Sequence, residues 1–208
     1  MAWRRRPLAL RARNANLARI GVGSALFAAS AIEARTRQVG STEETVFRSL
    51  NDLPDRWHVP VWAVMQSGSL AAVGVAGAAA FAGHRRTTAI GLVAAGTAMW
   101  GGAKVVKHRF GRGRPAAHVD DVHVRGKEQT GLGFPSGHAA VSFALAGVAA
   151  PSLGPVARVA VHVAAATTAG ARLYVGAHLP LDIAGGTGLG LAASGLTNLV
   201  LGDRRRGD

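Results

Sequence analysis

The stretch GFPSGHAAVSFALAGVAA, residues 133–150, sets a proline, a serine, a glycine and a histidine directly before an almost wholly apolar run. Pro135 disfavours helical backbone before it, and Ser136 belongs to the residue types that begin helices, so a helix is predicted to start here. A histidine is costly at the mouth of a membrane-like segment. His138 is therefore the first candidate functional residue.

Further apolar segments accompany this one along the chain. A helix needs about 20 mainly apolar residues to cross the hydrocarbon core of a bilayer. Six intervals are candidates: residues 16–32, 59–83, 87–106, 137–152, 155–176 and 180–201. The 28 glycines and many alanines favour close helix contacts in lipid. We expect an all-α, six-transmembrane-helix bundle in a single domain over residues 1–208, and the buried helices of a water-soluble protein are the less favoured alternative.

The arginine distribution predicts which side of the membrane each region faces, because basic residues concentrate on the cytoplasmic side. Residues 1–15 and the tail 202–208 are basic, and Arg85 and Arg86 lie in the short turn after the second segment. These regions are predicted to be cytoplasmic, and six crossings place both termini there. A cleaved signal peptide in the first segment is an alternative that would leave five spans and the same sides.

The connection over residues 107–136 departs from this rule. It is strongly basic, yet the number of preceding crossings places it on the extracytoplasmic face. Its basic side chains are Lys107, Arg109, Arg112, Arg114, Arg125 and Lys127. This concentration indicates a local role, so residues 107–136 are predicted to form a long outer catalytic loop.

Three short motifs are predicted to meet on that face. They are KHRFGRGRP (residues 107–115), PSGH (residues 135–138) and RLYVGAHLPLD (residues 172–182). Each alone is typical of a basic loop, a helix cap or a helix connection with a buried histidine. Their shared membrane face favours a single functional site instead.

The basic members of these motifs suit a phosphate group. Lys107 supplies a point charge, while Arg114 and Arg172 offer planar forks that match phosphate oxygens. The free backbone N–H groups near Ser136 and Gly137, at the start of a helix, are predicted to face the same anion.

The two histidines are predicted to act differently. His138 lies in the first turn of its helix, where bound phosphate would favour its protonated form, which suits a general acid. Pro180 fits the first turn of the last helix, so Asp182 lies close to His178. A hydrogen bond from one ring nitrogen of His178 to Asp182 would leave the other nitrogen free to attack phosphorus.

Together these residues resemble the three-part signature of the type 2 phosphatidic acid phosphatase superfamily, which includes vanadium haloperoxidases and bacterial acid phosphatases. The parts are Lys107 with Arg114 and Pro115, then Pro135, Ser136, Gly137 and His138, then Arg172 with His178 and Asp182. The resemblance implies metal-independent hydrolysis through a phosphohistidine, with His178 as nucleophile, Asp182 as its orienting group and His138 as acid. The phosphate-binding residues that it implies are Lys107, Arg114, Ser136, Gly137 and Arg172.

One residue departs from the family pattern. Many members have serine before the arginine of the third motif, whereas this chain has Ala171. One phosphate hydrogen bond is therefore expected to be absent, with weaker stabilisation but an unchanged mechanism.

Other polar residues have more ordinary explanations. The HVDDVH stretch (residues 118–123) has metal-ligand residue types, but a polar outer loop is favoured, and no metal or cofactor is expected. His162 lies inside an apolar segment and is expected to pair within the bundle. Trp57, Trp62 and Trp100 are expected to anchor segment ends at the membrane interface.

The function predicted from the sequence is an integral cell-membrane phosphatase. Its substrate is expected to be a lipid phosphate or diphosphate, such as a polyprenyl diphosphate, a polyprenyl-phosphosugar phosphate, phosphatidic acid or phosphatidylglycerophosphate, and its partners membrane lipids. The net charge of +13 is compatible with nucleic-acid binding, but the apolar segments argue against such a partner. A vanadate-dependent peroxidase of the same fold and a non-catalytic transporter or scaffold are the alternatives.

Overall fold

The computed structural model of the protein describes residues 2–202, with side chains from residue 10 onward, and every regular element in this part is helical. The all-α prediction is confirmed. The long helices are α1 (Ala2–Ala34), α5 (Arg86–Phe110), α7 (Pro155–Tyr174) and α8 (Pro180–Gly202). The shorter helices are α2 (Ser41–Asn51), α3 (His58–Met65), α4 (Leu70–Ala82) and α6 (Gly137–Ala149). Short 3-10 turns are η1 (Asp55–Trp57), η2 (Gln66–Gly68), η3 (Pro115–Ala117) and η4 (Ala150–Ser152).

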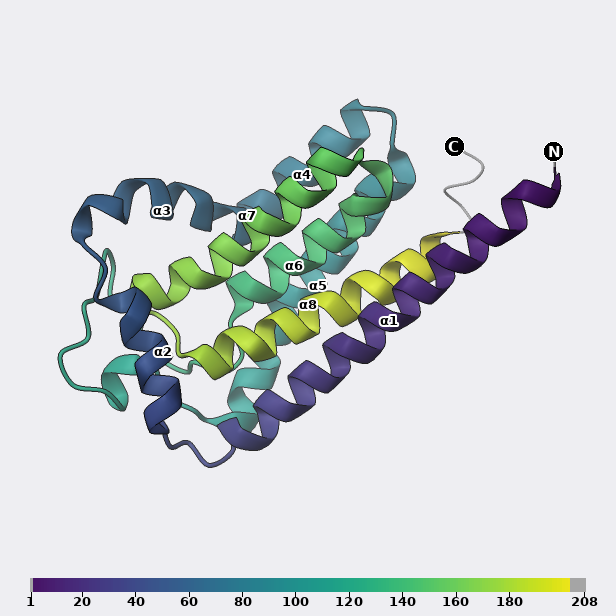
Figure 1. Ribbon diagram of the computed structural model, residues 1–208. Coiled ribbons are helices and arrows are strands. Elements are labelled where there is room, and N and C mark those ends of the chain that lie inside the picture. Colours follow the sequence, from purple (N-terminus) through teal and green to yellow (C-terminus); the bar gives the residue numbers. More distant parts are fainter. Residues whose placement is uncertain (1, 203–208) are drawn as a thin grey trace.

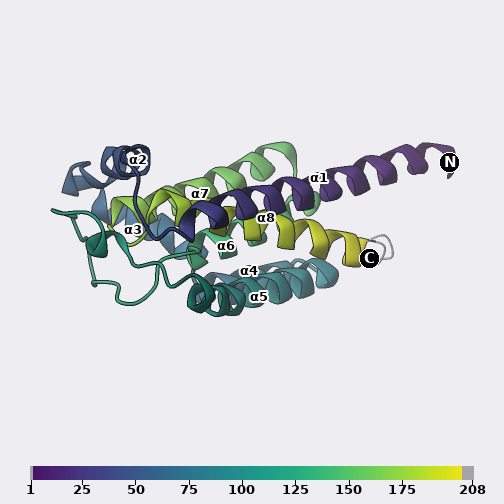
Figure 2. The same ribbon diagram turned by 90° about the horizontal axis from the view of Figure 1, so that it is seen from below.

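Helix α6 is the centre of the bundle. It packs against α5, α7 and α8, while α1 lies along α8 and α4 along α5. Figure 2 shows the resulting layers, with α6 and α8 between the pair α1 and α7 on one side and the pair α4 and α5 on the other. The stretch that begins with the PSGH motif therefore forms the core helix of the fold.

Glycine allows close helix contacts in the bundle, among them the one between α1 and α8. A Cβ atom on Gly188 would lie 2.6 Å from the carbonyl oxygen of Gly23 and 2.6 Å from the backbone nitrogen of Phe27. Only glycine permits this approach of two backbones, which is typical of helix packing in lipid. The small residues identified in the sequence thus serve helix contact.

Large apolar side chains cover much of the outer surface. Val75 on α4 is 70% exposed, Val105 on α5 is 68% exposed and Val156 on α7 is 85% exposed. Three helices are long and apolar enough to cross a membrane: α1 from Leu10, α5 and α8; a bent pair raises the number to four. These helices indicate a membrane protein, and the arrangement with six spans stays a prediction.

The predicted segment 59–83 is interrupted in the structure. The helical stretches Asp55–Gly68 and Leu70–Ala82 meet at 66°. Ser69 has extended backbone angles, and its hydroxyl accepts a hydrogen bond from the backbone nitrogen of Ala72 at 3.2 Å, so it begins a new helix. The QSGS sequence at residues 66–69 marks this break, which the prediction of one continuous apolar segment over residues 59–83 did not include.

The two ends of the bundle differ in composition. Figure 1 shows α2, α3 and the long loop between α5 and α6 at one end of the bundle. The described start of α1, the described end of α8 and the turn between α4 and α5 lie at the opposite end. We call these the loop end and the terminal end. The basic tail predicted for residues 202–208 lies outside the described residues, apart from Gly202.

Candidate active site

His178 lies in the short connection between α7 and α8, at the loop end. The C-terminus of α7 is closed by hydrogen bonds from the backbone nitrogens of Ala177 and His178 to the carbonyl oxygen of Arg172, at 3.0 and 3.2 Å. Gly176 has a φ of +71°, the left-handed conformation that glycine adopts without strain. This turn directs the chain back towards the bundle and buries His178, which is 2% exposed.

Asp182 holds the imidazole of His178 in place. Its Oδ2 atom lies 3.1 Å from Nδ1 of His178 and accepts a second hydrogen bond from the backbone nitrogen of Leu179, also at 3.1 Å. A carboxylate accepts hydrogen bonds, so Nδ1 of His178 is the donor and Nε2 carries the lone pair. This is the hydrogen-bonded pair expected from the sequence spacing.

Burial has an electrostatic consequence for His178. Desolvation, followed by the positive charges of Lys107, Arg172 and Arg114 and by His138, lowers the pKa of His178 well below 6.5. The ring is therefore neutral at neutral pH, as a nucleophile must be. These four groups come from all three motifs, so the three motifs lie close enough together to act on His178 electrostatically.

Three cations lie around His178, namely Lys107, Arg114 and Arg172, and none of them has a carboxylate partner among the described residues. Nζ of Lys107 donates to the carbonyl oxygens of Leu132 and Gly133 at 2.8 and 2.6 Å. Arg114 donates to two further carbonyl oxygens, those of Thr130 and Ala177, at 3.1 and 2.6 Å. These neutral acceptors fix the directions of the side chains and leave their charges uncompensated.

Arg172 is the most weakly bonded of the three. One of its terminal nitrogens donates to the thioether sulfur of Met65 at 3.1 Å, a weak acceptor, and its Nε atom is buried without a partner. Within residues 10–202, none of Lys107, Arg114 and Arg172 forms an ion pair. An anion that enters the site would supply the missing acceptors and charge.

The start of α6 differs in detail from expectation. Ser136 is the residue before the first helical turn, but its hydroxyl does not cap the helix and is buried without a partner. Its backbone nitrogen was expected to face the anion, and donates instead to the carbonyl oxygen of Asp182 at 2.8 Å. This bond ties the second motif to the third, because α6 and α8 begin side by side. The nitrogens of Gly137 and His138 still lie in the first turn, where helices bind anions.

Gly137 also has space beside it. A Cβ atom there would meet only the Cβ atom of Ala103, at an ordinary 3.7 Å. The packing of the protein itself therefore does not demand glycine at this position.

A buried charged cluster lies behind Asp182, and the sequence analysis missed it. Arg112, which has no solvent exposure, lies 3.3 Å from Oδ1 of Asp182. It also forms a two-pronged ion pair with Glu43 of α2, at 3.0 and 2.6 Å. Arg112 was counted only among the loop charges, and nothing in the sequence links Glu43 to residues so distant along the chain.

The remaining polar residues have other roles. In the HVDDVH stretch, Nδ1 of His123 lies 3.4 Å from Asp52, and the described residues hold no group of three potential metal ligands. His162 bonds the carbonyl oxygen of Arg158, one turn earlier in α7, at 2.8 Å. His162, which was expected to pair within the bundle, thus finds its partner on its own helix.

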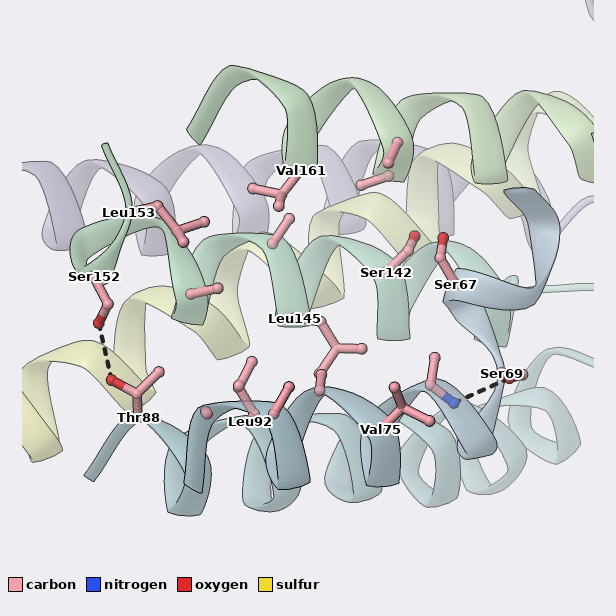
Figure 3. A pocket seen from close by; sticks show the side chains of 18 of the residues that line it. Ser67, Ser69, Val75, Thr88, Leu92, Ser142, Leu145, Ser152, Leu153 and Val161 are labelled. Atoms are coloured by element: carbon pink, nitrogen blue, oxygen red, sulfur yellow. Dashed lines mark hydrogen bonds between the residues drawn. The ribbon is translucent and has the colours of Figure 1, made fainter. Parts of the chain in front are cut away.

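An apolar cavity of about 980 Å³ begins beside the site and was not foreseen. It runs between α4, α6 and α7 (Figure 3). Ser67 and Thr168 are hydrogen-bonded at 2.6 Å at the loop end, and Thr88 and Ser152 at 2.9 Å near the terminal end. Between them the walls are mainly alanine, with Leu92, Leu145, Leu153 and Val161.

This cavity lies close to the candidate active site, although none of the predicted site residues lines it. Ser142, which lines it, lies one helical turn after His138 on α6. Gly68, directly before α4, packs so closely on the backbone of His138 that a Cβ atom there would lie 2.6 Å from the carbonyl oxygen of His138. The break before α4 therefore packs against the start of α6.

The fold and the site define a class: a helical membrane protein with an unpaired cationic pocket around two imidazoles. The family model of the PAP2 superfamily matches residues 86–206, and the chain belongs to this superfamily. The resemblance read from the three motifs is thereby confirmed. Among curated proteins, no sequence matches the chain.

Two solved structures share the fold. LpxE of Aquifex aeolicus superimposes with a TM-score of 0.70 at 22% identity, over 77% of this chain and 96% of LpxE. A transmembrane PAP2 type phosphatidylglycerolphosphate phosphatase from Bacillus subtilis superimposes with a TM-score of 0.71 at 20% identity, over 86% of this chain and 94% of that enzyme. The similarity extends over most of the bundle.

Proposed function

We propose that the protein is an integral membrane phosphatase that hydrolyses a lipid phosphate or diphosphate through a phosphohistidine. One observation carries this proposal: Lys107, Arg114 and Arg172, without carboxylate partners, surround a neutral His178 whose ring is oriented by Asp182. This arrangement combines the charge that binds a phosphoryl group with a nucleophile that can attack it.

The reaction begins with attack by Nε2 of His178 on phosphorus. The bond between phosphorus and the leaving oxygen breaks, and His138 donates the proton that this oxygen takes up. The three cations, the Ser136 hydroxyl and the N–H of Gly137 stabilise the charge on the phosphoryl oxygens. Asp182 stabilises the positive charge that the attached imidazole acquires.

Water completes the cycle. His138, now neutral, accepts a proton from a water molecule that attacks the phosphohistidine. The bond between phosphorus and Nε2 breaks, which releases inorganic phosphate and restores neutral His178. Each residue thus returns to its starting protonation state, and the reaction consumes only water.

The position of Ala171 supports the expectation of a weakened phosphate site. Ala171 is buried in an apolar cluster with Met65, Tyr174, Val175 and Ala177. Its methyl group offers no hydrogen bond to a phosphate held by the neighbouring Arg172. The Ser136 hydroxyl is then the side-chain hydroxyl available to the phosphoryl group in this proposal.

The apolar cavity supports a lipid substrate. Its walls suit a hydrocarbon chain, and its lining residue Ser142 lies one helical turn after His138, so the phosphate end of such a lipid would lie beyond that turn. The B. subtilis relative acts on a lipid phosphate, phosphatidylglycerolphosphate. We infer six crossings, with the loop end on the extracytoplasmic face and both termini in the cytoplasm, because the terminal end carries the arginine-rich turn at Arg85 and Arg86.

Phosphate release from a panel of lipid phosphates in detergent tests the proposal. The panel contains polyprenyl phosphate and diphosphate, phosphatidic acid and phosphatidylglycerophosphate, each with and without EDTA. We expect release from at least one lipid, insensitivity to EDTA, and loss of release in His178→Ala. Equal release by His178→Ala would refute the proposed nucleophile, and a folded protein that hydrolyses none of them would refute the function.

A further inference from the structure

The charged cluster behind Asp182 carries an inference about the proposed reaction. Arg112 is the largest side chain without solvent exposure in the described part of the chain. A buried guanidinium is destabilising unless anions compensate it. Two carboxylates do so here, Glu43 with two contacts at 3.0 and 2.6 Å and Asp182 with one at 3.3 Å.

The cluster has a net charge of −1, and this sum decides its effect on His178. With Asp182 alone, the charge of Arg112 would cancel that of the carboxylate that orients the nucleophile. Glu43 neutralises Arg112 instead, so the negative charge of Asp182 stays available to the imidazole. That charge is needed when phosphorylation makes the ring positive.

Glu43 also fixes the place of Asp182 through the backbone. Its Oε1 atom accepts a hydrogen bond from the backbone nitrogen of Leu181 at 2.9 Å, in the first turn of α8. Arg112 is held in addition by the carbonyl oxygen of Gln38 at 3.2 Å. The short helix α2, which lies across the loop end in Figure 1, thereby contacts Arg112, the ion-pair partner of the orienting residue, and the backbone of Leu181, the residue before it.

We propose that Glu43 and Arg112 are positioning residues that act on the nucleophile through Asp182. This inference rests on the proposed function, since it assigns a role within that reaction. Neither side chain contacts the phosphate. Their effect is to keep Asp182 fixed and its negative charge available to Nδ1 of His178.

Glu43→Gln tests the proposal with little change of shape, and Glu44→Gln is its matched control. Glu44 is the next residue on α2 and forms an ion pair with Arg48 at 2.8 Å, in which both side chains are more than a third exposed. We expect Glu43→Gln to lower kcat by about tenfold to a hundredfold, as is typical when a partner that orients a functional histidine is lost. KM and inhibition by inorganic phosphate should stay unchanged, because the three cations remain. Glu43→Asp should restore part of kcat, and Glu44→Gln should match the wild type.

A double-mutant cycle shows whether the effect passes through Asp182. If it does, Glu43→Gln combined with Asp182→Asn has the kcat of Asp182→Asn alone. Three outcomes would overturn the inference and leave the proposed phosphatase function standing. They are additive losses of kcat in the double variant, an unchanged kcat in Glu43→Gln, and a loss of kcat that a lower folded fraction in thermal unfolding explains. Absence of His178-dependent phosphate release in the wild type would overturn both proposals.

An independent observation lies at the opposite end of the bundle. A second cavity, of about 970 Å³, opens at the terminal end between α1, the start of α7 and the end of α8. Three arginines from distant parts of the sequence line it, together with leucines. The residues that matter here are Arg13, Arg19 and Arg158, with Leu10, Leu17 and Leu199.

The arginines of this cavity have no acidic partner among the described residues. Arg19 donates to the side chain of Asn16 at 3.3 Å, and Arg158 donates to the carbonyl oxygens of Ala150 and Leu153 at 3.0 and 3.1 Å. Arg19 and Arg158 also repel each other electrostatically. The sequence has no aspartate or glutamate in residues 1–32, 129–181 or 183–202, and Asp203 and Asp208 accompany three further arginines.

We infer that this cavity binds an anionic phospholipid of the leaflet at the terminal end. The lipid phosphate would lie between Arg19 and Arg158 and replace their repulsion with attraction. An acyl chain would follow the apolar wall at Leu17 and Leu199. A membrane lipid is the occupant because the cavity combines unpaired cations with apolar walls at an end of a membrane-embedded bundle.

Thermal unfolding in a zwitterionic detergent tests this site without reference to enzyme activity. Phosphatidylglycerol should raise the Tm of the wild type by several degrees, and phosphatidylcholine should not. The double variant Arg19→Gln, Arg158→Gln should lose this shift and bind fewer phosphatidylglycerol molecules in native mass spectrometry. The control double variant Arg11→Gln, Arg86→Gln removes two charges from the terminal end but outside the cavity, and it should keep the Tm shift with phosphatidylglycerol. An equal shift in both double variants, or an equal shift with phosphatidylcholine, would overturn the inference.

Discussion

Two properties of His178 act on its charge in the same direction. The ring is almost fully buried, and it lies among cations that would repel any positive charge on it. Both conditions keep the imidazole neutral, while Asp182 supplies the one anionic contact that orients it. In the proposed reaction the substrate brings the remaining negative charge, so attack becomes favourable only when phosphate is bound.

Replacing Asp182 tests this arrangement at the nucleophile. In Asp182→Asn the amide no longer stabilises a positive imidazole, so we expect kcat to fall at least about a hundredfold. KM should change little, because Lys107, Arg114 and Arg172 still bind the phosphate. Steady-state kinetics on purified protein measure both constants. An unchanged kcat would remove Asp182 from the mechanism.

The depressed pKa of His178 predicts the pH dependence of the reaction. Since the ring stays neutral below pH 6.5, the acid limb of kcat/KM assigned to His178 should lie below that value. The unfolded chain takes up the same proton near pH 6.5, so this group lowers the free energy of unfolding as the pH falls further. Profiles of kcat/KM against pH, measured with two substrates whose phosphates have different pKa values, separate the titration of the enzyme from that of the substrate. A shared limb at or above pH 6.5 would contradict the prediction.

The break between η2 and α4 gives the bundle both its cavity and its link to the site. Had residues 59–83 formed one straight helix, Gly68 would not pack on the backbone of His138. The extended backbone at Ser69 turns α4 by 66° and lets it line a cavity with α6 and α7. A polar interruption of an apolar helix thus shapes the surface that we propose for the lipid tail.

A bulky residue in the cavity should distinguish substrates by tail length. Ala76 on α4 lines the cavity, whereas Ala78 is exposed on another face of the same helix. We expect Ala76→Phe to raise KM for a long-chain lipid phosphate several-fold and to leave a short-chain analogue unaffected. Ala78→Phe should behave as the wild type with both. Equal KM changes for long and short chains would argue against a tail in this cavity.

The whole molecule separates its charges along the bundle axis. The loop end holds all the described acids together with Lys107, Arg114 and Arg172, and arginines are the only charged residues in the described part of the terminal end. Basic residues favour the cytoplasmic side, so the terminal end is the inner one in our proposal. The basic loop at residues 107–136 is an exception for which its proposed phosphate-binding role accounts.

The chain has no cysteine, which makes this orientation directly measurable. Lys127 in the long loop and His84 in the turn between α4 and α5 are both exposed. We expect Lys127→Cys in intact cells to react with a membrane-impermeant thiol reagent, and His84→Cys to react only after the membrane is permeabilised. The opposite pattern would reverse the orientation, and equal labelling of both positions would contradict a bundle that crosses the membrane.

The motif residues could be assigned from the sequence because their chemistry is local. Lys107, Arg114, His138 and Arg172 lie beside helix ends that proline, glycine and apolar runs mark in the chain itself. Whether a buried side chain finds a partner is not local. Glu43 approaches Arg112 and Leu181 only because α2 folds across the loop end.

The amino-acid sequence by itself determined that this protein is all-helical, that its helices suit a membrane, and that three motifs carry the signature of its superfamily. Periodicity, residue size and charge type act over a few neighbouring residues, so they can be read along the chain. Only the tertiary structure decided that the Ser136 nitrogen bonds to Asp182, that α4 turns away at Ser69, and that Glu43 and Arg112 lie behind Asp182. These features depend on contacts between segments far apart in the sequence, and such contacts exist only once the helices have packed.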